Sequence, residues 1–356
     1  MVVEDLLNIM VERNASDLFI SAGFPIHIKV NGALAELAPQ VIAGGDAEKL
    51  ASRLMNEKQQ HAFQAKPEMN FALSLENGAR FRVNIFRQRG EIGMVIRYLP
   101  SKIPQIDELY LPTYLHNLMD TKRGMILIVG ATGSGKSTTL AAMIDHRNSN
   151  YKSHILTIED PIEFVHPYKQ SVVNQREVEM DTHSYADALK NAMREAPDVI
   201  LIGEIRDSDT MQHAITYSET GHLCLSTLHA SNASHALDRI VNFFQKELQQ
   251  QILADMSRNL KAIISQRLVT KKDGGLVPAV EMMVVTPLIS SLIAKGDLSS
   301  IHEQMEKSTE DGVQTFDQAL MKLFEEEIID KEEALKHAES ASNLNVMIRL
   351  SQRKSR

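Results

Sequence analysis

A glycine-rich segment in the middle of the chain has the residue types and spacing of a phosphate-binding loop. Residues 130–137 read GATGSGKS, follow the apolar stretch 125–129 and precede the helix-forming run TTLAAMIDHRN. Glycines let the backbone wrap a β-phosphate, and the first amides of a helix point at an anion. Lys136 would neutralise phosphate charge and Ser137 would bind Mg²⁺. The predicted nucleotide contacts are Gly130, Ala131, Thr132, Gly133, Ser134, Gly135, Lys136, Ser137 and Thr138.

Two acidic segments that follow apolar strands could supply the metal ligand and the base that activates water. In DVILIGEIRD, Asp198 opens a strand that ends at Glu204, which would hold Mg²⁺ directly or through water beside the phosphate loop. In ILTIEDPIEF, the strand 155–158 leads to Glu159, and Glu163 lies four residues further on. We expect Glu163 to contact the hydrolytic water or the metal, and Glu159 to be a further metal ligand.

Two histidines flank the strand HLCLSTLH, at positions 222 and 229. Side chains an odd number of residues apart face opposite sides of a regular strand, so one histidine must lie beyond the strand end. Their polar neighbours Thr220, Thr227 and Asn232 are expected at the same sheet edge as Glu204. We therefore predict that His222 and His229 sense the γ-phosphate, with a purely structural role as the alternative for each.

The strands that carry these residues alternate with helical stretches, which predicts an α/β fold built on a mostly parallel sheet. The expected strands have the sequences MILIVG, HILTIED, SVVNQ, DVILIG and HLCLSTLH. From about Glu247 the pattern predicts a largely helical region. Residues 1–99 form a separate unit of mixed helices and alternating strands, and the proline-containing segment 100–112 is the expected linker to the domain 113–356.

Composition limits the class of protein. A length of 356 residues with 43% hydrophobic content is enough for two domains with cores of their own. The formal net charge of −8 disfavours a general nucleic-acid binder, and no nucleic-acid partner is expected. The single cysteine, Cys224, excludes an intramolecular disulfide. Apolar runs are too short to span a membrane and the start lacks the features of a secretory signal, so we expect a cytoplasmic protein.

Four ordered motifs resemble those of one known family. GATGSGKS, IEDPIEF, DVILIGEIRD and TGHLCLSTLH are similar to the Walker A, Asp box, Walker B and His box of the type II/IV secretion ATPases. The segments SDLFISAGFPIHIKVNG and RFRVNIFRQRG resemble the small N-terminal domain of the same family. The resemblance implies an ATPase with an N-terminal PAS-like α+β domain and a RecA-like P-loop NTPase core with C-terminal helices.

Within this family the chain resembles the type IV pilus retraction branch. The lone cysteine argues against the extension branch, whose members commonly carry a tetracysteine zinc insertion. Residues 288–295, LISSLIAK, lack the arginines of the AIRNLIRE element of PilT-like chains, so the chain is most similar to PilU-like members. The resemblance implies a homohexamer at the cytoplasmic face of the inner membrane. It would power or assist pilus retraction and twitching motility with a PilT-like sister retraction ATPase and an inner-membrane pilus platform protein.

The resemblance also implies that arginines from a neighbouring subunit's N-terminal domain stabilise the γ-phosphate. Arg82 and Arg97 are the candidates because they lie in a predicted hairpin with a basic face, and Arg206, just past Glu204, is an alternative from the same subunit. The basic face could instead be solvated or paired with acids of its own domain.

Two other functions remain open from the sequence. The altered segment 288–295 is compatible with a nucleotide-gated scaffold for the sister motor, which would need little turnover of its own. A nucleic-acid translocase with a RecA-like core would explain the basic hairpin, but the negative net charge and the absence of tryptophan disfavour it.

Overall fold

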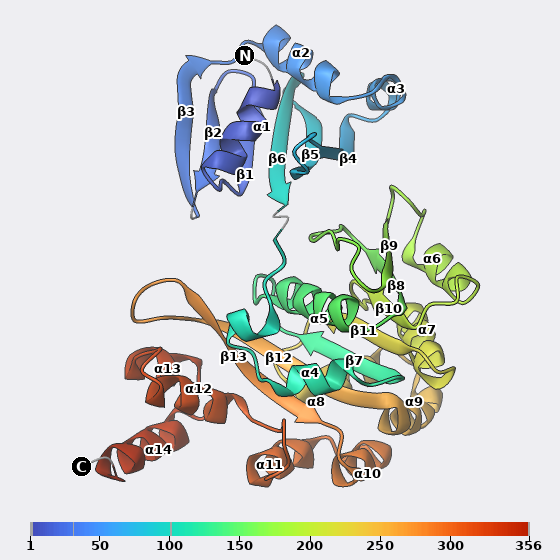
Figure 1. Ribbon diagram of the computed structural model, residues 1–356, viewed down its shortest axis with the longest axis vertical. Helices are drawn as coiled ribbons and strands as arrows, with labels where there is room; N and C mark the ends of the chain where they lie inside the picture. The colour runs from blue at the N-terminus through green and yellow to red at the C-terminus, as the bar shows by residue number, and fades with distance from the viewer. Residues whose placement is uncertain (1–2, 31, 100–101, 355–356) are drawn as a thin grey trace. The chain divides into compact units, whose positions relative to one another are not determined.

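The computed structural model describes residues 3–30, 32–99 and 102–354 (Figure 1). The chain divides into two compact units, Met1–Lys102 and Ile103–Arg356. Of the predicted linker, residues 100 and 101 lie outside the described ranges. Its remainder contains the short 3₁₀ helix η1 (Ile106–Leu109) and is followed by α4 (Tyr114–Met119), both of which belong to the second unit.

The N-terminal unit is a six-stranded antiparallel sheet with the order β3-β2-β1-β6-β5-β4. Its elements are α1 (Val3–Glu12), β1 (Asp17–Ser21), β2 (Pro25–Val30), β3 (Ala33–Val41), α2 (Gly44–Leu54), α3 (Glu57–Ala65), β4 (Glu68–Ser74), β5 (Arg80–Gln88) and β6 (Glu91–Leu99). Along β5 the fully buried Phe81, Val83 and Ile85 alternate with polar residues. This alternation places one face of the sheet against the apolar sides of α1 and α2.

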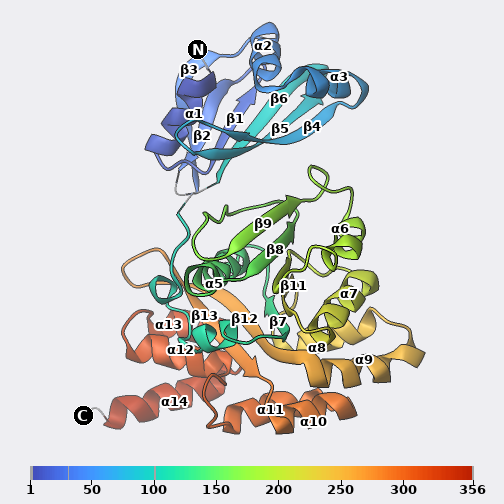
Figure 2. The same cartoon turned by 45° about the vertical axis from the view of Figure 1, so that its right-hand side comes forward.

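The second unit is built on a seven-stranded sheet with the order β13-β12-β7-β11-β10-β8-β9 (Figure 2). Every neighbouring pair is parallel except β12 and β13, which are antiparallel. The strands are β7 (Gly124–Val129), β8 (His154–Glu159), β9 (Val172–Glu177), β10 (Val199–Ile202), β11 (Leu223–Leu228), β12 (Leu260–Thr270) and β13 (Leu276–Val284). The parallel arrangement brings the carboxyl ends of β7, β8, β10 and β11 to one edge.

Helices cover both faces of this sheet. One face of the sheet packs against η1, α4 and α5, and the other packs against α6 to α11. The helices α12 to α14 pack on the half of the β12–β13 hairpin that is nearest its turn. The remaining helices are α5 (Lys136–Asn150), α6 (Tyr185–Ala192), α7 (Ser208–Glu219), α8 (Ala233–Asn242), α9 (Lys246–Asn259), α10 (Pro287–Lys295), α11 (Ser299–Lys307), α12 (Phe316–Glu325), α13 (Lys331–His337) and α14 (Ala341–Lys354). The strands β7 and β10 are buried at every position because both of their faces are covered. The predicted α/β architecture is confirmed.

The sequence-based expectation of a largely helical region after Glu247 is wrong for two strands. Residues 260–284 form the β12–β13 hairpin, whose turn contains Gly274 and Gly275 in the positive-φ region. The strands are rich in β-branched residues, and the paired glycines are a turn signal that the sequence-based assignment missed.

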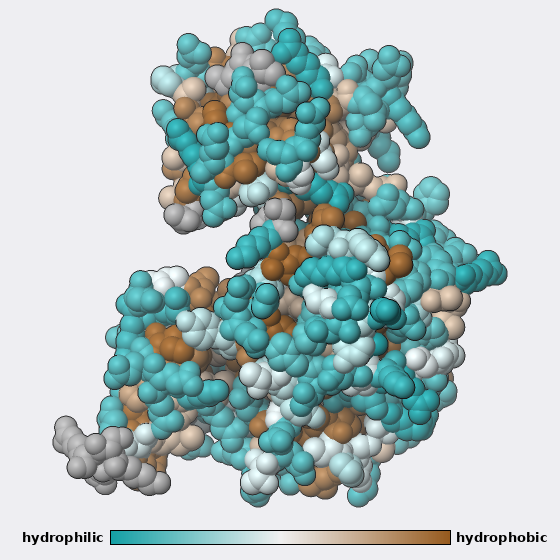
Figure 3. Space-filling model, viewed as in Figure 1, coloured by the Kyte–Doolittle hydropathy of each residue, from teal (hydrophilic) through white to brown (hydrophobic). Residues whose placement is uncertain are grey.

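The surface is mainly hydrophilic in the view of Figure 3, where apolar residues are scattered over both units. Scattered exposed apolar side chains are normal for a folded protein. In the described part of the chain, no helix combines the length and the apolar character that crossing a bilayer requires.

Candidate active site

The predicted phosphate loop lies between the buried strand β7 and the start of α5. Gly130, Gly133 and Gly135 all have positive φ angles, of 154°, 78° and 90°. A Cβ atom on Gly130 would lie 2.5 Å from the Ser134 hydroxyl oxygen and 2.6 Å from the Gln266 carbonyl oxygen. Only glycine therefore allows the chain to turn this tightly beside β12.

The loop holds a lysine cation and an unpartnered hydroxyl. Lys136 Nζ donates to the carbonyl oxygens of Gly130, at 3.0 Å, and Ala131, at 2.9 Å. Burial lowers the pKa of Lys136, while Glu204 and Glu163 act in the opposite direction. The Ser134 hydroxyl is buried and has no hydrogen-bond partner within the described residues. Because buried hydroxyls are normally hydrogen-bonded, this group is poised for an external ligand.

A cleft of about 570 Å³ opens beside the loop. It gathers most of the predicted site residues at the carboxyl edge of the sheet. Its lining includes Thr132, Gly133, Gly135, Lys136, Ser137, Thr138, Glu159, Glu163, Glu204, Arg206 and His229. Residues from the loop and from the ends of three further strands therefore meet in one place, as their positions at strand ends predicted.

Glu204 lies at the centre of a charged network in this cleft. Its Oε1 atom is 3.1 Å from His229 Nε2, and its Oε2 atom accepts a 2.7 Å hydrogen bond from Arg206 Nε. Arg206 also lies 3.8 Å from Asp160. Glu204 and His229 meet because β10 and β11 pair in parallel and lead to the same edge of the sheet. The network fixes the carboxylate and links it to His229.

Glu159, at the end of β8, has an altered acidity. Burial raises the pKa of its carboxyl from 4.5 to about 7, although hydrogen bonds from Thr157, at 2.6 Å, and Gln175, at 3.3 Å, favour the charged form. Nearby Glu163 raises this pKa further. A divalent cation in the cleft would favour the ionised form of Glu159, so its charge depends on what the cleft binds.

This acidity predicts a measurable effect on stability. The raised pKa means that the folded protein holds a proton on Glu159 that the unfolded chain releases, so the free energy of unfolding falls as pH rises from about 4.5 to about 7. Relative to the natural chain, Glu159→Gln should gain stability across this window, by at most about 3 kcal/mol. Urea unfolding of both proteins at pH 5, 6, 7 and 8 measures the difference. A difference that does not change with pH would contradict the assignment.

His222 does not lie in the cleft. All six residues of β11 separate it from His229, so it lies at the amino edge of the sheet, where its carbonyl oxygen accepts a hydrogen bond from Gly124. Its ring Nδ1 is 3.1 Å from both the Thr220 hydroxyl and the Tyr217 carbonyl oxygen. The prediction that His222 and Thr220 share the Glu204 edge is wrong, because the whole strand lies between the two histidines.

Arg82 and Arg97 lie in the other unit, directly opposite each other on β5 and β6. Arg97 Nε donates a 2.8 Å hydrogen bond to Asp17, so this arginine pairs with an acid of its own unit although its side chain is 63% exposed. Arg82 is half-buried and forms no ion pair with any residue that the structure describes. A contribution of either arginine to a neighbouring subunit stays a prediction.

Two further residues beside the loop and cleft were missed from the sequence. The Tyr185 hydroxyl approaches the backbone so closely that a Cβ on Gly203 would lie 2.7 Å away, and burial raises the pKa of this tyrosine. Gln266, on β12, is buried with its Oε1 atom unpartnered in the described part of the chain. Gln266 could not be recognised because its strand was expected to be helical.

The site consists of a buried strand, a glycine-rich loop and a helix, with an acid and a histidine from neighbouring parallel strands at the same edge of the sheet. This arrangement defines a P-loop nucleotide-hydrolysing core. The chain belongs to the Type II/IV secretion system protein family, whose model matches residues 1–334.

Individual relatives narrow this class. The type IV pilus ATPase PilU of Pseudomonas aeruginosa is 49% identical over 348 residues, which cover 98% of this chain and 91% of the relative. The type IV pilus retraction ATPase PilT of the same organism is 40% identical over 341 residues, covering 96% of this chain and 99% of the relative. A crystal structure of the pilus retraction motor PilT with bound ADP has a TM-score of 0.90, at 39% identity, and covers 96% of this chain and 98% of its own. The chain is thus a PilU/PilT-like type IV pilus ATPase that binds nucleotide, and ATP hydrolysis is its expected reaction.

Proposed function

We propose that this chain is the subunit of a homohexameric, Mg²⁺-dependent ATP-hydrolysing motor that powers or assists retraction of type IV pili and hence twitching motility. The observation that carries the proposal is the convergence of Lys136, Glu204 and His229 in one cleft of a chain similar to PilU and PilT over nearly its whole length. The motor would work at the cytoplasmic face of the inner membrane and contact the pilus platform protein there.

The residues of the cleft fit ATP and Mg²⁺. The unpartnered Ser134 hydroxyl and the cation of Lys136 suit phosphate oxygens, and Ser137 and Glu204, with Glu159 as a further ligand, are the oxygen donors that Mg²⁺ prefers. Bound Mg²⁺ would bridge the phosphates and neutralise their charge. Of the protein groups, Glu163 would take a proton from the attacking water. The Glu204–His229 contact would report the γ-phosphate to the rest of the subunit.

The segment 288–295 supports an assisting role. It forms most of α10, with Ile289 and Ile293 buried and Leu288 exposed. Its exposed residues include no arginine, in contrast to the arginine-containing element of PilT-like chains. We therefore propose that the chain works with a PilT-like sister retraction ATPase.

Gene deletion in a piliated bacterium tests the cellular role. If the proposal is correct, deletion with the sister gene present reduces retraction force or twitching, and surface pili accumulate. Deletion in a strain that already lacks the sister motor should then add little. Normal twitching and a normal pilus number in the strain that lacks only this gene would contradict the proposal.

A nucleotide-gated scaffold is the second candidate, and the same segment 288–295 favours it. The scaffold would bind ATP and join the sister motor without needing its own turnover. A Lys136→Ala chain that still supports retraction in cells containing the sister motor would favour the scaffold. Loss of that support, with the variant protein present at its normal level, would favour the motor.

Arg82 provides a test of assembly. If it reaches the nucleotide of a neighbouring subunit, Arg82→Ala should lower kcat at least about tenfold without changing nucleotide affinity. Co-assembly of Arg82→Ala with Lys136→Ala subunits should restore part of the activity, because some interfaces then combine an intact arginine with an intact loop. The steady-state rate of phosphate release measures both effects.

Arg53→Ala is the matched control, since Arg53 is an exposed arginine on α2 of the same unit. Its kcat should equal that of the natural chain. An unchanged kcat for Arg82→Ala, or no recovery in mixed assemblies, would remove Arg82 from the proposed interface.

A further inference from the structure

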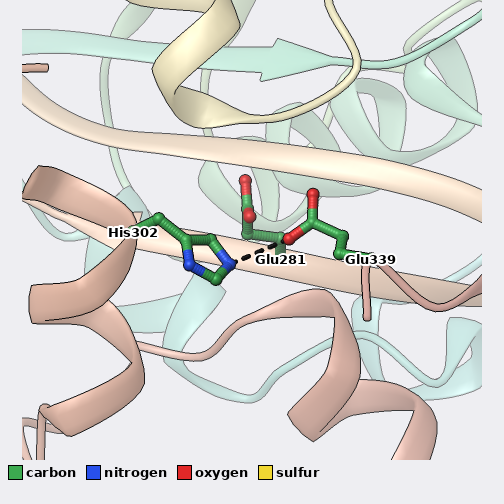
Figure 4. A group of neighbouring side chains, drawn as sticks. All are labelled: Glu281, His302 and Glu339. Atoms are coloured by element: carbon green, nitrogen blue, oxygen red, sulfur yellow. Dashed lines mark hydrogen bonds and ion pairs between the residues drawn. The ribbon is translucent and has the colours of Figure 1, made fainter. Parts of the chain in front are cut away.

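Three potential metal ligands meet on the second unit, outside the residues that line the nucleotide cleft. They are Glu281 on β13, His302 on α11 and Glu339 in the segment between α13 and α14. One ligand atom from each lies within 4.8 Å of the others. Figure 4 shows His302 and Glu339 facing each other, with Glu281 beside them on the strand. The three residues come from positions 281, 302 and 339, so the tertiary fold brings them together.

Each carboxylate is held through one oxygen. Glu281 Oε1 accepts hydrogen bonds from the Ala233 amide, at 2.7 Å, and from the Ser265 hydroxyl, at 2.9 Å. Glu339 Oε1 accepts hydrogen bonds from Asn232 Nδ2, at 3.1 Å, and from Arg267 Nη2, at 3.4 Å. Outer hydrogen bonds of this kind orient carboxylates that bind metals.

The other oxygens remain available to a shared ligand. Glu339 Oε2 is 2.9 Å from His302 Nε2, and Glu281 Oε2 makes no hydrogen bond with the described residues although this side chain is only 1% exposed. This oxygen, beside the Glu339 carboxylate and the His302 ring, is therefore free to bind a cation.

We propose that Glu281, His302 and Glu339 bind one Zn²⁺ ion, with water as the remaining ligand. A nitrogen donor with two carboxylates suits zinc and disfavours Mg²⁺, which prefers an all-oxygen shell. Donors 2.0–2.1 Å from a tetrahedral zinc lie about 3.3 Å apart, close to the 2.9 Å between His302 and Glu339. The His302 side chain is 42% exposed, which gives the ion a route from solvent.

Zinc at this position would join the C-terminal helices to the nucleotide site. Glu281 accepts a hydrogen bond from the first amide of α8, and Glu339 accepts one from Asn232, the N-cap residue of α8. His229 lies only three residues before Asn232 in the chain. The ion would fix α11 and the segment before α14 to the start of α8. Zinc is therefore expected to stiffen the chain segment that carries His229, so the site is structural and adjacent to catalysis.

Zinc binding to the tag-free full-length protein without nucleotide tests the proposal. Equilibrium dialysis with metal analysis should give one Zn²⁺ per chain, and the same titration with Mg²⁺ should show no binding at this site. Glu281→Gln, His302→Asn and Glu339→Gln should each weaken zinc binding at least about tenfold. Zinc should also raise the Tm of the natural chain but not of the His302→Asn protein, whose substitution lies at the surface.

Two controls separate this site from other zinc ligands. His61→Ala, which removes an exposed histidine of the N-terminal unit, and Glu204→Gln, which alters the nucleotide cleft, should both keep the stoichiometry and affinity of the natural chain. No zinc binding at a free Zn²⁺ concentration of about 10 µM would overturn the proposal. Binding that survives His302→Asn, or that is lost in Glu204→Gln, would overturn it as well.

Discussion

Glu204→Gln is expected to lower kcat for ATP hydrolysis by about 100- to 10,000-fold while changing nucleotide affinity by less than about tenfold. The substitution keeps the shape of the side chain and removes its charge. Without that charge the residue would be a weaker ligand for the proposed Mg²⁺, and Arg206 and His229 lose the anion that lies between them. Mg²⁺-dependent phosphate release measures kcat, and titration with a fluorescent ATP analogue measures affinity.

Two further substitutions test whether the loss of kcat is specific to Glu204. Glu247→Gln, an exposed acid on α9, should leave kcat unchanged. Glu163→Gln should also reduce kcat, since Glu163 lines the same cleft, but should leave the Glu204–His229 contact intact. A Glu204→Gln protein whose kcat stays within threefold of the natural value would show that this acid takes no part in the chemistry.

The phosphate loop could be predicted from the sequence because its chemistry is local. Consecutive residues form the loop, and the glycines, Lys136 and Ser137 need only a preceding strand and a following helix. The meeting of Glu204 and His229 could also be predicted, since parallel strands end at a common edge and both residues follow apolar runs. Local pattern and simple topology were sufficient for these residues.

Residues that depend on the length of a strand or on distant pairing could not be assigned in this way. His222 was misplaced because the periodicity of β11 indicates which side a residue faces, but not which end of the strand lies at the cleft. The pairing of Arg97 with Asp17 spans 80 residues and follows from the antiparallel contact of β1 with β6.

The β12–β13 hairpin shows how one missed element hides several functional groups. The expected helical region concealed the strand that places Gln266 beside the phosphate loop. It also concealed the strand that carries Glu281 to His302 and Glu339. None of these side chains belongs to a recognisable local motif, so only the folded arrangement reveals their proximity.

Lys136→Ala is expected to lower kcat for ATP hydrolysis by about 1,000-fold and to weaken ATP binding by about 10- to 100-fold. The substitution deletes the cation that would face the phosphates, and the Gly130 and Ala131 carbonyl oxygens lose their donor. The effect on binding distinguishes this variant from Glu204→Gln, whose defect should be confined largely to kcat. The same phosphate-release and analogue-binding assays measure both quantities.

Lys152→Ala is the matched control, because Lys152 is an exposed lysine just beyond the end of α5. It should leave both binding and turnover unchanged, which separates the position of Lys136 from a general loss of positive charge. The unfolding midpoint of each variant should stay near that of the natural chain, since Lys136 lies at the cleft and not in the core. A folded Lys136→Ala protein with normal turnover would contradict the assignment of the loop as the catalytic phosphate site.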